Sequence, residues 1–289
     1  MLLLLMAGIF LLASIAAAPS WGPGTHIHLT LELCRRLKKK RKLREPQRLI
    51  LEHFQPFLYG NIAADVINFK AYGGVKNHCH NWNIHERLEA HAHDAAARAF
   101  ILGYLCHLAA DIIAHNHFVP YHMVHALPPR ILGHAYWEAK ADNGVSDVEW
   151  HSIDRLKQNK AIHAYDRLIH QAVKRKVLGL RSNKWIFNNI LLISCRQRWR
   201  SFVRGIESRK VRHPLDEPFH LRCRVMSLRN MMSVFYPRRF ALLKVHDPTG
   251  REALRGALRL RRELVRDFGT RNKAREVAMA LAHSAYGLR

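Results

Sequence analysis

Apolar residues recur along this chain at helical spacing, and no run alternates in the manner of a strand. Most glycines and prolines fall between the helical segments, and the Gly pair within residues 71–77 indicates a loop. The stretch 86–118 is long enough to break in two. Helices are predicted over residues 29–43, 86–118, 131–140, 146–177, 183–209, 217–236, 251–268 and 271–286. The predicted class is all-α, and the absence of a Pro-, Gly- or Ser-rich linker favours a single domain over residues 21–289.

Three polar side chains interrupt the most apolar helical segment, residues 99–118. His107 and Asp111 are four residues apart, so they lie one above the other on one helix face. His117 lies about 80° from His107 around the axis of a regular helix. Burying such groups among Leu, Ile and Ala is costly unless each is paired or binds a metal ion. A single pair of this kind is equally compatible with hydrogen-bonded core histidines.

The same spacing occurs again on a second predicted helix, where His134 and Glu138 share one face. Asp65 and His80 lie upstream, each in a segment of its own. Histidine and carboxylate alternating over four segments form a mixed nitrogen and oxygen ligand set that suits zinc. The repeated pattern therefore favours a metal site over isolated core histidines.

The N-terminal segment resembles a secretory signal peptide. Residues 2–18 are almost wholly apolar, and small residues precede a possible cleavage after Ser20. The alternative is an uncleaved membrane anchor, although the run is short for a span. Cleavage would export the protein, to a periplasm or outside the cell, and leave Trp21 with a free α-amine. Such an amine can lose its proton to a metal at neutral pH, and His26 lies close enough in sequence to join it.

Charge divides the chain into two unlike halves. Residues 1–150 carry 15 Lys and Arg against 12 Asp and Glu, whereas residues 151–289 carry 32 against 10. The basic helical half is expected to attract an anionic membrane surface or nucleic acid, unless it is merely a solvated face. Five cysteines without a CxxC pair do not form a disulfide framework. No Gly-rich phosphate loop is present.

Taken in order, these motifs resemble the zinc-dependent phospholipase C family, which is related to single-strand-specific zinc nucleases. The matching features are an N-terminal Trp followed by His, an Asp, a His before an aromatic residue, H-x3-D-x5-H and H-x3-E, all within residues 21–145. The resemblance implies a multi-helix fold with a trinuclear zinc cleft. The nine ligands that it implies are Trp21, His26, Asp65, His80, His107, Asp111, His117, His134 and Glu138.

The family's cluster distributes these ligands over about three zinc ions. One ion is implied to bind Asp65, His80, His107 and Asp111. A second is implied to bind His117, His134 and Glu138. The third is implied to bind the Trp21 amine and carbonyl, His26 and Asp111, which bridges two ions.

Some histidines compete with these ligands or fall outside the motifs. His28 is an alternative to His26, and His78 an alternative to His80. His115 has no place in the motifs and is expected to lie at the surface or behind the ligands.

The resemblance also implies an activity. It predicts a phosphodiester hydrolase in which Asp65 is both a ligand and the general base. Because Glu138 stands where the nucleases usually have Asp, the expected reaction is phospholipase C cleavage of phospholipid to diacylglycerol and a phosphomonoester. A nuclease acting on single-stranded nucleic acid and a non-catalytic zinc-binding basic scaffold are the alternatives.

Overall fold

The computed structural model describes residues 21–66, 79–127, 134–172, 215–268 and 271–288, and every regular element in these ranges is a helix. The all-α prediction is therefore confirmed. The first half contains α2 (Pro23–Lys38), α3 (Glu45–Glu52), α4 (Phe54–Ala63), η1 (Ala64–Val66), α5 (Asn83–Glu89), α6 (Ala95–Ile113), η4 (Ala114–Phe118), α7 (Val119–His125) and α8 (His134–Asp142). The second half contains α9 (Asp147–Gln158), η6 (Lys160–Tyr165), α10 (Asp166–Ala172), α13 (Glu217–Ser233), α14 (Pro237–Leu243), α15 (Arg251–Phe268) and α16 (Arg271–Tyr286).

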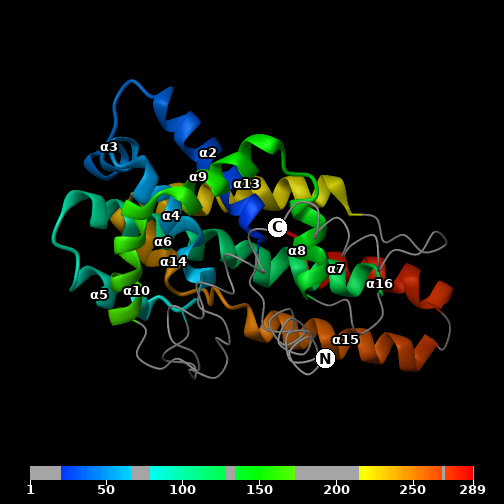
Figure 1. Cartoon of the computed structure of the whole chain (residues 1–289). Coiled ribbons are helices and arrows are strands. Elements are labelled where there is room, and N and C mark those ends of the chain that lie inside the picture. Colours follow the sequence, from blue (N-terminus) through cyan, green and yellow to red (C-terminus); the bar gives the residue numbers. More distant parts are fainter. Residues whose placement is uncertain (1–20, 67–78, 128–133, 173–214, 269–270, 289) are drawn as a thin grey trace, which may run out of the picture.

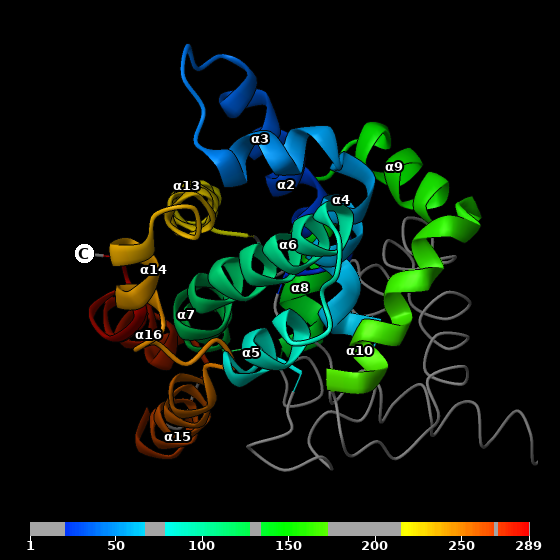
Figure 2. The same ribbon diagram turned by 90° about the vertical axis from the view of Figure 1, so that its left-hand side faces the viewer.

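Helix α6 occupies the centre of the molecule, and the other helices surround it (Figures 1 and 2). It continues through η4, a π-helical turn, into α7. By length and composition Ala95–His125 could cross a membrane, but 83% of its most apolar 18-residue window is buried inside the fold. A helix that is apolar on all sides is typical of the core of a large domain. The polar residues of α6 are therefore buried together with its apolar ones.

Helix α4 crosses α6 at a point where both helices carry glycine. A Cβ atom on Gly60 would lie 2.1 Å from the carbonyl oxygen of Phe100, and one on Gly103 would lie 2.1 Å from that of Phe57. Any larger side chain would push the two backbones apart. The close approach brings the end of α4 and the following η1 against the middle of α6.

The remaining helices form two groups around this centre. Helix α2 packs against α4, α8, α9 and α13, whereas α15 and α16 pack along α7. Figure 1 shows α15 and α16, orange and red, on the side where α7 lies. One cluster of buried apolar residues extends from Trp21 to Tyr286, so segments far apart in sequence contribute to the same core. That residues 21–289 form a single domain stays a prediction.

The observed helices agree best with the predicted ones at the C-terminal end. The predictions for residues 251–268 and 271–286 match α15 and α16. The predicted stretch 86–118 is broken before α6, where the Asp94 side chain accepts a hydrogen bond from the Ala97 amide and caps a new helix. The predicted helix 146–177 is shorter, because Asn159 has extended backbone angles and ends α9.

Other predictions meet the structure only in part. The helix predicted over residues 29–43 begins earlier, at Pro23, and ends at Lys38. The predicted signal peptide, the loop 71–77 and the helix 183–209 lie outside the described residues. Four of the five cysteines are described, and all four are free and buried: Cys34, Cys79, Cys106 and Cys223.

Candidate metal centre

Five predicted ligands meet at the centre of the fold and form what we call the inner cluster: His26, Asp65, His80, His107 and Asp111. Asp111 is its hub. Its Oδ1 lies 3.1 Å from Nε2 of His26, and its Oδ2 lies 3.1 Å from Nε2 of both His80 and His107. The His80 and His107 Nε2 atoms are 2.9 Å apart. The structure therefore brings together side chains that span 86 positions of the sequence, from residue 26 to residue 111.

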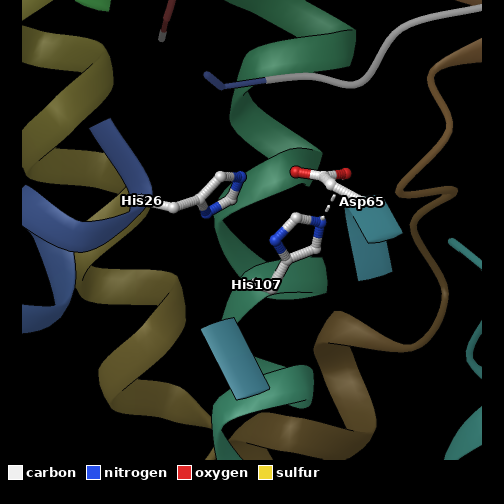
Figure 3. Close-up of side chains that lie close together, drawn as sticks. All are labelled: His26, Asp65 and His107. Atoms are coloured by element: carbon white, nitrogen blue, oxygen red, sulfur yellow. Dashed lines mark ion pairs between the residues drawn. The ribbon is translucent and has the colours of Figure 1, made fainter. Parts of the chain in front are cut away.

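Three helical elements and the turn that contains His80 deliver these side chains. Figure 3 shows His26 from α2, His107 from α6 and Asp65 converging on one point, with an ion pair between Asp65 and His107. The Asp65 Oδ1 is 3.3 Å from Nε2 of His80 and 3.7 Å from Nε2 of His107. Because Asp65 sits in η1, its position follows from the close glycine contact between α4 and α6.

The ring of His107 is held from behind by the backbone. Its Nδ1 donates a hydrogen bond to the carbonyl oxygen of Asn61, at 2.7 Å. With the proton on Nδ1, the lone pair of Nε2 faces the inner cluster. The backbone next to His80 is fixed as well, because the carbonyl oxygen of Cys79 accepts a hydrogen bond from the Tyr104 hydroxyl. Such outer contacts are typical of histidines that bind metal.

The inner cluster fits zinc by distance and by burial. Two ligand atoms on one tetrahedral zinc lie about 3.3 Å apart, given Zn–N and Zn–O bonds near 2.0–2.1 Å. The separations within the cluster are 2.9–3.7 Å. Both oxygens of Asp111 and both ring nitrogens of His26 are buried without a hydrogen bond of normal geometry. Buried polar atoms are almost always satisfied, and a bound cation would satisfy these.

Electrostatics within the inner cluster favour an ionised Asp111 and a neutral His26. Burial lowers the pKa of His26, and the adjacent charge of His107 lowers it further. Burial acts to raise the pKa of Asp111, but the electrostatic attraction and hydrogen bonding of the His107 and His26 rings outweigh it and hold that pKa well below the usual value. Neutral imidazole and ionised carboxylate are the forms that bind zinc.

A second group lies beside the first and is called the outer cluster: His115, His134 and Glu138. One ligand atom from each lies within 4.8 Å of the others, which is close enough for one ion. Nε2 of His134 is 2.6 Å from Oε1 of Glu138. Nδ1 of His115 donates to the carbonyl oxygen of Pro248, so Nε2 is the nitrogen that could bind a metal ion. The His115 and His80 rings are 6.2 Å apart, so the two clusters are neighbours.

The outer cluster contains His115 where the motif had indicated His117. In a regular α-helix the two would lie about 80° to either side of His107. Residues 114–118 instead form a π turn, in which each residue advances less around the axis. This turns His115 toward the His107 face and His117 away from it. His117 donates its Nδ1 to the carbonyl oxygen of Tyr286, at 3.0 Å. A π turn leaves no signal in the apolar spacing, so the sequence could not indicate that His115 lies beside His134 and Glu138.

The segment that begins at Trp21 is anchored close to the inner cluster. The Trp21 indole is fully buried, and its Nε1 donates to the Ser227 hydroxyl at 3.1 Å. The buried Asp142 carboxylate accepts the amides of Gly24 and Thr25 at 2.9 and 2.8 Å, and the Thr25 hydroxyl at 2.6 Å. Burial raises the pKa of Asp142 to about 6. Because Asp142 ends α8, it ties the start of α2 to the helix that carries His134 and Glu138.

The competing histidines are placed differently. The Nδ1 atom of His28 lies 2.7 Å from the Glu149 carboxylate, and its Nε2 atom contacts Arg224. His28 therefore lies between two charged side chains at the edge of the fold. Its side chain is 26% exposed, whereas that of His26 is fully buried. The alternative of His78 to His80 lies outside the described residues.

Comparisons with known proteins agree with this centre. The family model described as zinc dependent phospholipase C matches residues 25–188, more than half of the chain. The match includes both clusters and ends before α13. Searches of curated proteins and of solved structures returned no match. With its all-helical fold and clustered histidines and carboxylates, the chain belongs to the zinc-dependent phospholipase C family of hydrolases.

Proposed function

We propose that this protein is an exported phospholipase C, which uses about three zinc ions to cleave the phosphodiester of a phospholipid into diacylglycerol and a phosphomonoester. The observation that carries the proposal is the buried inner cluster within the family match. In this cluster three imidazoles and two carboxylates converge on one point of the core. Among the described residues, metal binding is what explains that convergence. Export follows the predicted cleavage before Trp21.

The division of the residues among the ions follows the family resemblance. Asp65, His80, His107 and Asp111 would hold the first ion. The Trp21 amine and carbonyl, His26 and a shared Asp111 would hold another. His134 and Glu138 would hold the remaining ion, together with His115 on the geometry or His117 on the motif. The contact between Asp111 Oδ1 and His26, with Oδ2 facing His80 and His107, supports the bridging role of Asp111.

Bound zinc would neutralise the phosphate, lower the pKa of a water molecule and stabilise the attacking and leaving oxygens. The chain itself would supply orientation and a proton acceptor. Asp65 is the general base in this scheme, because it is the cluster carboxylate that does not bridge ions. Water would form a bond to phosphorus while the bond from phosphorus to the glycerol oxygen breaks. The proton that Asp65 accepts would pass to the departing glycerol oxygen, which becomes the diacylglycerol hydroxyl.

Two observations favour lipid over nucleic acid. Glu138 is the residue typical of the phospholipases at the last motif. In the structure it is 2% exposed and contacts His134 on the same helix face. The family description also names phospholipase C. The nuclease remains the second candidate, because the basic half of the chain is equally attractive to a polynucleotide.

The test is a parallel assay under matched zinc and salt. The purified protein is incubated with mixed phospholipid vesicles, with a soluble phosphocholine diester, and with single-stranded DNA and RNA. We expect release of phosphomonoester from lipid, lost on chelation and restored by zinc. Efficient nucleic-acid cleavage without lipid turnover would replace the proposal with the nuclease, and no activity in a zinc-replete protein would replace it with the scaffold. Zinc analysis with N-terminal sequencing tests the ion count and the Trp21 start.

A further inference from the structure

Helix α15 exposes apolar side chains although it is one of the most basic helices of the chain. Leu258, Val265 and Phe268 are 40%, 56% and 39% exposed. Ala257 and Leu264, which each precede an exposed residue by one position and so lie about 100° from it around the axis, are buried against the fold. The apolar face of the helix is therefore wider than the part that the core covers, and the uncovered part is called the exposed strip. The whole helix lies beyond residues 25–188, so the family match does not cover it.

The exposed strip is continuous and bordered by arginine. Leu258 and Val265 are seven residues apart, and Phe268 follows three residues later, so all three lie toward one side of the helix. Arg262 is four residues after Leu258, and Arg261 is three residues after it, so the pair flanks Leu258 and Val265. A hollow of about 460 Å³ lies against this surface and is lined, among the described residues, by Leu258, Arg261, Arg262 and Val265. The side chains of Arg255, Arg259, Arg262 and Arg266 are exposed.

An anionic bilayer matches both features of this surface. Apolar side chains between arginines can enter the boundary of headgroups and acyl chains while the guanidinium groups contact lipid phosphate. A nucleic-acid backbone needs the arginines but gains little from exposed Leu and Val. The charge and the apolar strip together therefore favour lipid.

The start of α15 reaches the metal centre. The backbone of Gly250, the residue before the helix, packs directly against His115, and Pro248 accepts the His115 hydrogen bond. Arg251 and Glu252, the first two residues of α15, help to line a hollow of about 500 Å³ together with Asn81 and Asn116. Asn81 follows His80, and Asn116 follows His115. A helix that lies on a bilayer would thus begin at the metal centre.

We propose that α15 is the element that docks this protein on anionic membranes, through Leu258, Val265 and Phe268 and the arginines beside them. The inference rests on the proposed function, since docking would bring lipid headgroups to the metal centre. Membrane docking itself does not require catalysis. A protein that binds vesicles without hydrolysing lipid is therefore distinguishable from one that hydrolyses a soluble diester without binding vesicles.

The test is co-sedimentation of the protein with vesicles of phosphatidylcholine alone or mixed with phosphatidylglycerol. The apolar strip is changed by Leu258→Ser with Val265→Ser, and the matched control is Val148→Ser with Leu221→Ser. Val148 and Leu221 are also well exposed, at 65% and 60%, on other helices. The charge is tested by Arg262→Gln with Arg266→Gln, against Arg222→Gln with Arg229→Gln on α13. Any binding through residues 1–20 is common to all variants, so the comparisons isolate α15.

We expect the α15 serine variant to bind mixed vesicles at least about tenfold more weakly, because two apolar side chains no longer enter the bilayer. The α15 arginine variant should lose about fivefold per arginine on mixed vesicles at low salt, and little on phosphatidylcholine alone. Both controls should bind like the wild type. Turnover of a soluble diester should stay unchanged in every variant, which separates docking from chemistry.

Three results would overturn the proposal. Equal vesicle binding by the α15 variants and their controls would show that the strip does not dock. Loss of single-stranded DNA binding in the arginine variant, with vesicle binding intact, would assign the surface to nucleic acid. A wild-type dimer that becomes monomeric in the serine variant, by light scattering, would assign it to a second copy of the chain.

Discussion

The inner and outer clusters share ligand chemistry but differ in how the chain holds them. Every residue of the inner cluster is at most 2% exposed, and its elements are fixed by the tight contact between α4 and α6. In the outer cluster the His134 side chain is 25% exposed, and His115 depends on a π turn and on the carbonyl of Pro248. The comparison teaches that helix packing builds the inner site, whereas a local irregularity and a distant loop build the outer one.

The largest effect is expected from Asp111→Asn. A bridging carboxylate serves two cations, and its loss leaves their charges poorly screened from each other. Activity should fall on the order of a thousandfold, since several kcal/mol of charge stabilisation are lost. Zinc analysis should show fewer bound ions than in the wild type. A variant that keeps its full zinc content would mean that Asp111 bridges nothing.

A chain extended before Trp21 should lose one zinc ion and most of its activity. The third site needs a free α-amine, which only processing can create. The matched control is the same extension removed by a protease that leaves Trp21 first. Metal analysis before and after removal checks the expectation, and three bound ions with the extension in place would exclude the amine as a ligand.

His115→Gln and His117→Gln decide between geometry and motif in the outer cluster. The geometry predicts that His115→Gln loses the outer ion, with a fall in zinc affinity of about 10–100-fold or more, whereas His117→Gln retains it. A graded chelator titration followed by zinc measurement separates the two. The reverse result would restore His117 to the ligand set, and equal loss would mean that both residues help to hold the site.

The smallest effect concerns buried histidines that belong to neither cluster. Burial lowers the pKa of His122 to about 3 and that of His220 to about 4. Below pH 6.5 the unfolded chain binds protons at these histidines and the native protein does not, so stability falls as the pH falls. Between pH 6 and its native pKa, each histidine lowers the free energy of unfolding by up to about 1.4 kcal/mol for each pH unit of acidification.

This slope is measurable as a difference between two proteins. Urea unfolding of the wild type and of His220→Phe, at pH 7, 6 and 5 and at fixed zinc, cancels the contributions that both share. The variant should lose less stability on acidification. An equal loss of stability in the two proteins would show that His220 takes up its proton in the native protein as it does in the unfolded chain, contrary to its burial against Trp21 and Phe118.

The two clusters were not equally predictable. All five residues of the inner cluster are candidate ligands from the sequence, because His107 and Asp111 share a helix face and because the ordered motifs resemble a family. The pattern also predicted the all-α class and two helices, 251–268 and 271–286, with their observed bounds. The pattern predicted neither the end of α9 at Asn159, which local backbone angles decide, nor the early start of α2 at Pro23, where a distant carboxylate accepts the backbone amides.

The sequence by itself determined the helical class, the ligand types and the spacing that pairs them along one helix, because these follow from local periodicity. Only the tertiary structure decided which segments meet. Glycines on two helices set how closely α4 approaches α6, and Asp142 ties α2 to α8 across 117 positions. The π turn that selects His115 over His117, and the exposed strip of α15, likewise depend on packing. Apolar spacing predicts that a helix has apolar faces, but only its neighbours determine which of those faces is covered.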